Sequence, residues 1–454
     1  MPELKAAYDQ AMAQLTGPGG PFETTRQTID GTDYTVITSA ARNLREVFET
    51  GAAFGDKEFL VYEGERWSFA DMYNQAAAIG RALVDRCGIR AGDRVAIAMR
   101  NYPEWMSSYI AVTSIGAVVV PLNSWGQARE LAFALEDAQA RVVFCDQQRL
   151  DLVADQLEAL DIEAVIVRPA RDQQPGRACT LEAFTAQAQG AAMPPADIDP
   201  EALAMILDTS GTTGTPKGAV SSHRALCQAL ANLECGAMAS AMINPEAIGA
   251  MLGSGHEPTQ LLAVPLFHVS GLHAVFLSAF KAGRRVVMMY KWDTEEALRL
   301  IESERITVCS AAPAMVMQLL EAPAWATTDT SSLFSIGAGG AATPPRAARL
   351  IEEKVTDSYP GTGWGMTESN AVGTSFTGLP FKNKPGSAGF LNPTVEISVR
   401  DGSGQELTPG TAGELWIKSP TLINEYWHRP DANAEDFHDG WFNSGDVGYF
   451  DADG

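Results

Sequence analysis

Short apolar segments alternate with segments of helical periodicity along most of this chain. In the first half, the expected strands are residues 95–99, 117–121 and 141–145. The helical segments around them are residues 69–87, 103 to about 115, and 127–139. Strands and helices that alternate in this way are typical of crossover units on a parallel sheet with helices on both faces. The pattern therefore predicts an α/β fold.

The alternation stops twice. Residues 171–200 are rich in Gln, Ala and Pro, and we expect a loosely packed connection there. A second set of strands is then expected at residues 260–265, 285–289, 306–310 and 333–336. After residue 380 the period changes to two, at 394–399 and 413–417, which indicates a small antiparallel β unit. We predict three units, over residues 1–200, 201–380 and 381–454.

Charge and composition exclude several classes of protein. The 454 residues carry a net charge of −23, which argues against binding to nucleic acid or to anionic membranes. The N-terminus lacks the pattern of a signal peptide, and the apolar run 110–122 is too short to span a bilayer. The six cysteines and six histidines show no metal-ligand spacing. We therefore predict a cytoplasmic protein with reduced thiols and no integral membrane segment.

The most distinctive local motif is Thr209-Ser210-Gly211-Thr212-Thr213-Gly214, continued by Thr-Pro-Lys217-Gly218. Closely spaced backbone N–H groups, hydroxyls and one cation suit a polyphosphate. The spacing before the Gly-Lys pair excludes a Walker A loop, and Gly218 stands where Ser or Thr should follow. The stretch predicts either a nucleotide loop of another kind or a flexible surface loop.

Other segments carry groups that suit a nucleotide. Residues 337–342, Gly-Ala-Gly-Gly-Ala-Ala, would let a flat ring lie against backbone, although a tight turn explains them equally well. Trp364 lies among glycines and could stack on a purine, while Glu368 could hold Mg²⁺ beside phosphates. Asp446 could accept hydrogen bonds from ribose hydroxyls, and His268 ends an apolar strand. Taken singly, each also fits a core residue, a turn or a solvated side chain.

The order and spacing of these motifs resemble the adenylate-forming (AMP-binding) enzymes, and acyl-CoA synthetases in particular. The resemblance covers nearly the whole chain and extends to residues 59–69. It implies two doubly wound subdomains packed as a layered αβαβα domain, followed by a small distorted antiparallel β-barrel. It also implies a family reaction in two steps. A carboxylate attacks the α-phosphate of ATP to give acyl-AMP and pyrophosphate, and the thiol of CoA then displaces AMP.

The resemblance assigns roles residue by residue. Thr209 to Lys217 would surround the β- and γ-phosphates, Thr367 would contact the α-phosphate, and Glu368 would coordinate Mg²⁺. His268 would lie where the acyl pocket meets the thiol tunnel. The residues expected around the adenosine are Gly340, Ala341, Ala342, Gly363, Trp364, Gly365, Met366 and Asp446. The expected partners are ATP, Mg²⁺, CoA and a carboxylic acid, and the sequence leaves a homodimer open.

Three features depart from the family pattern. Asp208 replaces an aromatic residue before the loop, and Trp364 replaces the commoner Tyr. The chain also ends at Gly454, before the hinge and the C-terminal lid domain that supplies a lysine for adenylation in this family. We therefore expect this chain to bind its nucleotide and acid but to be severely impaired in both half-reactions.

The acid is expected to have an uncharged tail, because residues 261–280 contain no carboxylate to pair with a substrate ammonium. A fatty, alicyclic or aromatic acid fits, and an ordinary buried helix fits as well. Within the same fold, an acyl-AMP ligase that loads a carrier protein and a luciferase-like oxygenase remain alternatives. A non-catalytic nucleotide-binding scaffold is an alternative of another class, and a Walker-type NTPase fits least well.

Overall fold

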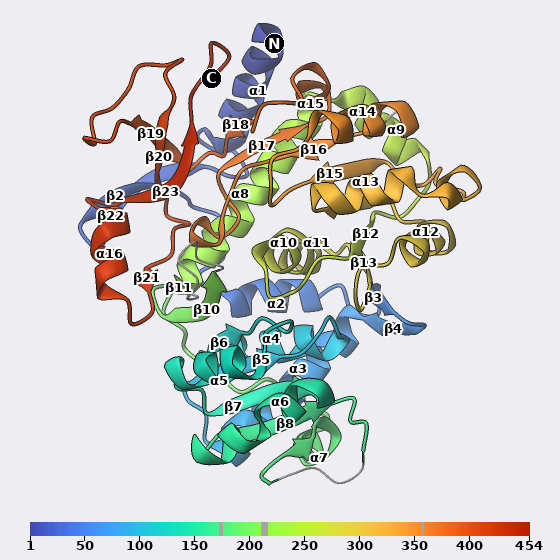
Figure 1. Ribbon diagram of the computed structural model, residues 1–454, viewed down its shortest axis with the longest axis vertical. Coiled ribbons are helices and arrows are strands. Elements are labelled where there is room, and N and C mark those ends of the chain that lie inside the picture. Colours follow the sequence, from blue (N-terminus) through green and yellow to red (C-terminus); the bar gives the residue numbers. More distant parts are fainter. Residues whose placement is uncertain (172–175, 210–216, 356–357) are drawn as a thin grey trace.

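The computed structural model describes residues 1–171, 176–209, 217–355 and 358–454 (Figure 1). Two large sheets carry most of the strands. In the view of Figure 1 the first sheet lies at the bottom, the second above it, and a smaller red sheet at the upper left. Both chain termini lie at the top of this view.

Within the described residues, the first sheet has eight strands in the order β21-β11-β10-β6-β5-β7-β8-β9. Its strands are β5 (Arg94–Ala98), β6 (Val118–Pro121), β7 (Val142–Asp146), β8 (Glu163–Val167), β9 (Cys179–Thr180), β10 (Leu203–Thr209), β11 (Lys217–Ser222) and β21 (Glu425–Tyr426). The helices between them are α3 (Phe69–Cys87), α4 (Pro103–Ser114), α5 (Ala128–Asp137), α6 (Gln147–Ala159) and α7 (Leu181–Thr185). Strands β5 to β9 run parallel, as the alternation predicts, whereas β10–β11 is an antiparallel hairpin.

The second sheet, in the part of the chain that the structure describes, has nine strands in the order β18-β17-β16-β15-β14-β12-β13-β3-β4. Its strands are β3 (Glu58–Tyr62), β4 (Glu65–Ser68), β12 (Thr259–Leu262), β13 (Arg285–Met288), β14 (Val308–Ala311), β15 (Ser335–Ala338), β16 (Gly361–Thr362), β17 (Thr374–Thr377) and β18 (Phe390–Leu391). Its helices are α2 (Leu44–Ala52), α8 (His223–Met242), α9 (Pro245–Gly253), α10 (Val269–Gly271), a π-helix (Leu272–Leu277), α11 (Ser278–Ala282), α12 (Thr294–Ser303), α13 (Pro313–Glu321), a 3₁₀-helix (Pro323–Ala326), α14 (Pro345–Lys354) and α15 (Leu379–Asn383).

Sheet membership does not follow the predicted division at residue 200. The hairpin β3–β4 comes early in the chain but pairs with β13 of the second sheet. The hairpin β10–β11 follows residue 200 but joins the first sheet, where Met205 pairs with Val119. Each large sheet is therefore completed by a segment from the other side of that division.

The third unit contains the antiparallel sheet β19-β20-β23-β22, as the change of period predicts. Its strands are β19 (Glu396–Arg400), β20 (Gly413–Lys418), β22 (Phe437–His438) and β23 (Trp441–Gly448), with α16 (Pro430–Asp436) before β22 and a 3₁₀-turn (Thr367–Ser369) preceding the unit. A separate N-terminal part consists of α1 (Pro2–Thr16) and the hairpin β1 (Thr24–Ile29) and β2 (Thr32–Ile37).

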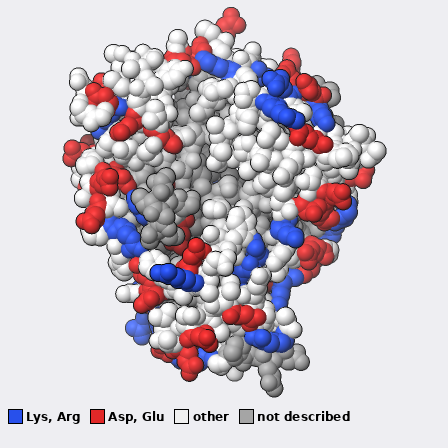
Figure 2. All heavy atoms as spheres, in the orientation of Figure 1, with Lys and Arg blue, Asp and Glu red and all other residues white. Residues whose placement is uncertain are grey.

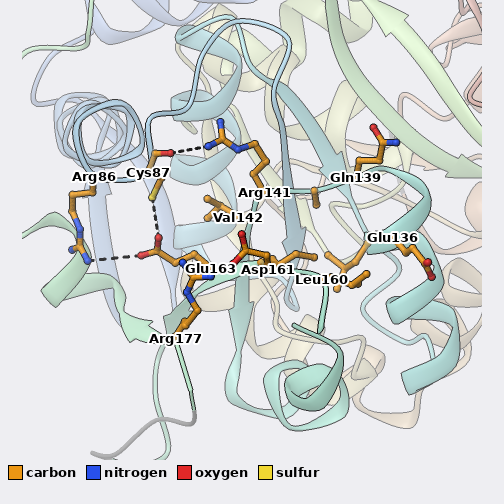
Figure 3. Close-up of a pocket in the computed structure, with 13 residues that line it drawn as sticks. Arg86, Cys87, Glu136, Gln139, Arg141, Val142, Leu160, Asp161, Glu163 and Arg177 are labelled. Carbon is orange, nitrogen blue, oxygen red and sulfur yellow. Dashed lines mark hydrogen bonds and ion pairs between the residues drawn. The ribbon is translucent and has the colours of Figure 1, made fainter. Parts of the chain in front are cut away.

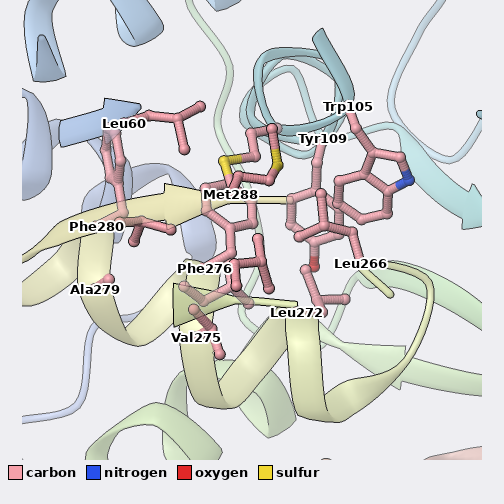
Figure 4. Close-up of a cluster of buried hydrophobic side chains, with 14 of the residues drawn as sticks. Leu60, Trp105, Tyr109, Leu266, Leu272, Val275, Phe276, Ala279, Phe280 and Met288 are labelled. Atoms are coloured by element: carbon pink, nitrogen blue, oxygen red, sulfur yellow. The ribbon is translucent and has the colours of Figure 1, made fainter. Parts of the chain in front are cut away.

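Aromatic side chains join the helices that lie between the two large sheets (Figure 4). Trp105 and Tyr109 of α4 stack with ring centroids 5.5 Å apart. Tyr109 meets Phe276 of the π-helix edge to face at 6.0 Å, and Phe276 lies 6.3 Å from Phe280. All four are fully buried, and large aromatic rings dominate the energetics of such a core. This shared layer fixes the two sheets relative to each other, as the layered αβαβα arrangement requires.

The segment 171–200, expected to be loosely packed, contains ordered structure where it is described. Strand β9 extends the first sheet, and α7 follows it directly. Phe184 of α7 is buried and meets Phe144 of β7 edge to face, with ring centroids 5.9 Å apart. That part of the prediction is therefore wrong, because the polar composition hides two apolar anchors, Leu181 and Phe184, which are enough to dock a short helix.

All six cysteines are free thiols. No single helix in the described part of the chain is long and apolar enough to cross a membrane, although α8 and α9, bent by 97°, reach that length and composition as a pair. Acidic and basic side chains are interspersed over the face shown in Figure 2.

Candidate active site

A cavity of about 510 Å³ lies between the end of the second sheet and the small antiparallel sheet. Its walls include Gly340, Ala341 and Ala342 after β15, residues 363–365 after β16, and Asp446 of β23. These residues are far apart in sequence, yet the fold brings them to one cavity. They include most of the residues expected around the adenosine.

The cavity wall is shaped by the Trp364 indole. Its Nε1 donates a hydrogen bond to Oδ2 of Asp446 at 2.6 Å, so that the predicted stacking ring and the predicted ribose acceptor are already in contact. The Trp364 backbone is held by Thr374, whose Oγ1 accepts from the Trp364 N–H at 3.0 Å. Gly340, Ala341 and Ala342, which also line the cavity, have small or no side chains, and this leaves room for a flat ring beside the backbone.

Glu368 lies in the 3₁₀-turn that follows this wall. Its Oε1 accepts the Tyr426 hydroxyl at 2.8 Å, and its carbonyl accepts the Ile423 N–H at 2.8 Å. Burial raises the pKa of the Glu368 carboxyl, against the hydrogen bond from Tyr426 and the nearby charge of Lys217. The side chain is thus fixed in place with one oxygen partnered.

Lys217 begins β11 and pairs across the hairpin with Thr209. Its Nζ lies 3.2 Å from Oδ2 of Asp436 and 4.5 Å from the centroid of the Tyr426 ring. Sequence reasoning did not identify Tyr426 or Asp436. Nothing in their local pattern marks them, because they reach Lys217 only through the pairing of β21 with β11 and the position of α16.

The predicted loop residues Ser210, Gly211, Thr212, Thr213 and Gly214 lie outside the described residues. At the base of the loop, Asp208 pairs with Gly218 across the hairpin. Burial raises the pKa of Asp208 to about 6, and the nearby Asp137 adds to the shift while Arg429 opposes it.

A buried polar network holds the Thr367–Ser369 turn from behind. Asn370 ends the turn with a left-handed backbone, φ 52°. Its Oδ1 accepts from Ser221 Oγ at 3.1 Å and contacts His273 Nε2 at 3.1 Å, while its Nδ2 donates to the Thr421 carbonyl at 2.9 Å. The turn is therefore connected to β11, to the π-helix and to the segment before β21. Sequence reasoning did not identify this network.

His268 is placed apart from the cavity wall. It precedes α10, and its ring lies beside Phe267 with centroids 4.7 Å apart. Burial lowers the pKa of His268. Lys217, Met366, Thr367 and Glu368 also lie outside the cavity wall, and of these Lys217 and Glu368 share Tyr426 as a contact.

A second cavity of about 480 Å³ lies where β7 and β8 of the first sheet begin (Figure 3). Most of its charged side chains are paired with one another or with backbone. Arg86 lies 3.8 Å from Glu163, which also accepts from the Cys87 thiol at 3.4 Å, and Arg141 donates to the Cys87 carbonyl at 3.1 Å. Burial raises the pKa of Cys87 to about 12, so this thiol is not an activated nucleophile. None of the predicted site residues lines this cavity.

Comparison with known proteins agrees with this geometry. A family model described as "AMP-binding enzyme" matches residues 47–427. A long-chain-fatty-acid–CoA ligase of Bacillus subtilis is 30% identical over 434 residues, which cover 89% of this chain and 74% of the relative. A 2-succinylbenzoate–CoA ligase of Bacillus velezensis is 30% identical over 401 residues, which cover 87% of this chain and 73% of the relative.

A solved structure, the N-terminal domain of FACL13 from Mycobacterium tuberculosis, superposes with a TM-score of 0.74 at 26% identity. The match covers 91% of this chain and 98% of that domain. A Mycobacterium tuberculosis fatty acyl CoA synthetase gives a TM-score of 0.74 at 26% identity over 91% of this chain and 77% of its own. The matched family model spans both large sheets and the Glu368–Tyr426 contact, and this chain belongs to the AMP-binding enzyme family.

Proposed function

We propose that this protein joins a carboxylic acid to CoA through an acyl-adenylate. A carboxylate oxygen attacks the α-phosphorus of ATP, the bond to the bridging oxygen breaks, and pyrophosphate leaves. The CoA thiol then gives up its proton to solvent, its sulfur attacks the acyl carbon, and AMP leaves with the electron pair of the broken acyl–phosphate anhydride bond. The observation that carries the proposal is the single cavity lined by Gly340–Ala342, Trp364 and Asp446.

In this proposal the Trp364 indole stacks on adenine and the Asp446 carboxylate accepts hydrogen bonds from the ribose. Oδ2 of Asp446 accepts a hydrogen bond from the indole, so Oδ1 of Asp446 is the oxygen that would face the sugar. Thr367 would contact the α-phosphate, and Lys217, together with the predicted Thr209–Gly214 loop, would neutralise the outer phosphates. His268 would border the acyl pocket and the path of the thiol. Adenylation depends mainly on positioning and charge neutralisation, which these groups supply.

The residues present fit a magnesium ion that is held partly by phosphate. Mg²⁺ is commonly bound by one or two carboxylates together with substrate phosphates. Among the described residues, no group of three or more His, Cys, Asp or Glu could form an all-protein metal site. Glu368 is the carboxylate of the Thr367–Ser369 turn that the family resemblance assigns to Mg²⁺. Its Oε1 accepts a hydrogen bond from the Tyr426 hydroxyl. When bound, Mg²⁺ would offset the negative charge of the phosphates.

The acid that we propose has an apolar tail, either fatty, alicyclic or aromatic. The segment from Leu261 to Phe280, which includes His268, contains no carboxylate and is largely buried. An amino acid would bring an ammonium group into this apolar surrounding without a partner, which is costly. Relatives named as a long-chain-fatty-acid–CoA ligase and a feruloyl-CoA synthase are consistent with this range.

An ATP–pyrophosphate exchange assay on the full-length protein, with a panel of acids and subsequent addition of CoA, tests the proposal. We expect exchange with an apolar acid and release of its CoA thioester. Preference for an α-amino acid would contradict the substrate class. Acyl-AMP that is formed but not passed to CoA would favour a carrier-protein ligase, and nucleotide binding without exchange would favour a scaffold.

A further inference from the structure

Tyr426 joins Lys217 to Glu368, and Asp436 pairs with Lys217, although sequence reasoning singled out neither Tyr426 nor Asp436. Tyr426 lies on β21, which pairs with β11 through Ala219. Its hydroxyl contacts Glu368, and its ring faces the Lys217 ammonium. Asp436 ends α16, and its Oδ2 lies 3.2 Å from the same ammonium nitrogen. The result is a continuous chain of contacts from Asp436 through Lys217 and Tyr426 to Glu368.

We propose that Asp436 is the resting counter-ion of Lys217 and that Tyr426 is a positioning residue for Glu368. This inference rests on the proposed function, in which Lys217 meets the outer phosphates of ATP and Glu368 meets Mg²⁺. In the absence of nucleotide, Asp436 and Tyr426 hold the side chains of Lys217 and Glu368 close to the base of the phosphate loop. When ATP binds, a phosphate replaces the Asp436 carboxylate as the partner of Lys217.

The exchange of partners is supported by exposure and geometry. The side chains of Lys217 and Asp436 are 26% and 21% exposed, so an anion from solvent can reach the ammonium. Ion pairs that are partly open to water contribute little, because both groups are also well solvated when apart. A polyphosphate carries more negative charge than one carboxylate and attracts the ammonium more strongly. The Tyr426 face retains the cation during the exchange by a cation–π contact.

Tyr426 acts on Glu368 through a single hydrogen bond. Its hydroxyl donates to Oε1 of Glu368, and none of the described residues donates a hydrogen bond to Oε2 of Glu368. One oxygen is thereby fixed and the other is left for a cation. Hydrogen bonds to charged groups are stronger than those between neutral groups, so loss of the hydroxyl should release the carboxylate from this orientation.

Calorimetric titration of the chain with ATP and with AMP tests the role of Asp436. In Asp436→Asn the competing charge is removed, and we expect ATP to bind about two- to fivefold more tightly. AMP lacks the outer phosphates, so its affinity for Asp436→Asn should stay unchanged. This unchanged affinity also reports that the site of the variant is folded. Glu435→Gln is the matched control, because it removes an exposed charge from the same helix and should leave the ATP affinity unchanged.

An equal change for ATP and AMP, or the same change in Glu435→Gln, would overturn the role of Asp436. If the unaltered chain binds neither nucleotide, the proposed function itself fails. If it binds both and Asp436→Asn binds ATP no more tightly, only the counter-ion inference fails.

Titration with ATP in the presence and absence of Mg²⁺ tests Tyr426. Tyr426→Phe keeps the ring under Lys217 but removes the hydroxyl. We expect Mg²⁺-free ATP to bind as before, whereas the gain in affinity on adding Mg²⁺ should fall about tenfold. Tyr73→Phe on α3 is the control for loss of a hydroxyl elsewhere. An unchanged Mg²⁺ gain in Tyr426→Phe would contradict the inference.

Discussion

Gly373 provides the space in which the Trp364 indole lies. A Cβ at this position would be 2.7 Å from Cε3 of the indole and 2.3 Å from the Trp364 carbonyl oxygen. Because both separations are shorter than van der Waals contact, Gly373→Ala must displace the ring or its backbone. Overpacking of this kind typically costs about 1–3 kcal/mol, and we expect AMP to bind roughly tenfold more weakly in calorimetric titration.

Gly402→Ala is the matched control for this substitution. Gly402 does not line the cavity, and a Cβ there would meet open space. Its AMP affinity should stay within experimental error of that of the unaltered chain. Equal weakening in both variants would mean that Gly373 has no particular relation to the indole.

Two buried histidines should make stability depend on pH. Burial lowers the pKa of His223 and of His273 to about 4, from an ordinary value of 6.5. Between these values the unfolded chain binds more protons than the folded chain, so stability falls as the pH is lowered through this window and these groups add no further loss below about pH 4. At pH 5 each histidine should reduce the free energy of unfolding by about 2 kcal/mol relative to pH 7.

Urea unfolding of the chain and of His273→Gln at both pH values measures this contribution. The variant cannot take up the second proton, so the loss between pH 7 and pH 5 should be smaller in it by about 2 kcal/mol. Carboxylates titrate equally in both proteins, and the difference therefore isolates His273. Identical losses would show that His273 does not stay neutral in the folded chain.

At the scale of elements, α7 is a short helix that depends on one aromatic anchor. Phe184 is 1% exposed, contacts Phe144 of β7 and lies under the Arg86 guanidinium, 4.9 Å from its ring centroid. We expect Phe184→Ala to lower the free energy of unfolding by about 3–5 kcal/mol, because it leaves a cavity beside the first sheet. Glu182→Ala on the exposed side of the helix should change it by less than about 0.5 kcal/mol in the same denaturant titration.

Elements with local signals could be predicted from sequence, and elements that depend on distant partners could not. Helix α3 covers residues 69–87 as expected, because the Ser68–Asp71 capping box begins it and Gly88, with φ 61°, ends it. By contrast, the hairpin β10–β11 joins the first sheet through pairing with β6, far back in the chain. No local pattern contains that information.

The candidate site divides in the same way. Trp364, Glu368 and Asp446 could be selected because their residue types and spacing match motifs. Tyr426 and Asp436 could not, since their relation to Lys217 exists only after β21 has paired with β11. Supporting residues of this kind are set by the tertiary fold, so the roles proposed for the motif residues stay predictions until they are measured.

At the scale of the whole molecule, the cavity depends on two separate sheets. Trp364 follows β16 of the second sheet, Asp446 lies on β23 of the small sheet, and their hydrogen bond connects the two. A ligand held by both residues binds the folded chain only when the two sheets are in their native positions relative to each other. AMP should therefore stabilise the molecule as a unit. At a free concentration of one hundred times Kd, binding adds about 2.7 kcal/mol to the free energy of unfolding.

For a chain of this size, that stabilisation should raise Tm by about 3 °C in a thermal unfolding scan with AMP. Asp446→Asn removes the charged acceptor while Trp364 keeps a carbonyl oxygen to which its N–H can donate. At the same AMP concentration we expect the shift to fall below about 1 °C, with the ligand-free Tm nearly unchanged. A full shift in the variant would mean that AMP binds without contact to β23. A lowered ligand-free Tm would instead mean that the charge of Asp446 itself stabilises the contact between the two sheets. That contact would then depend on the ionised carboxylate even when no nucleotide is bound.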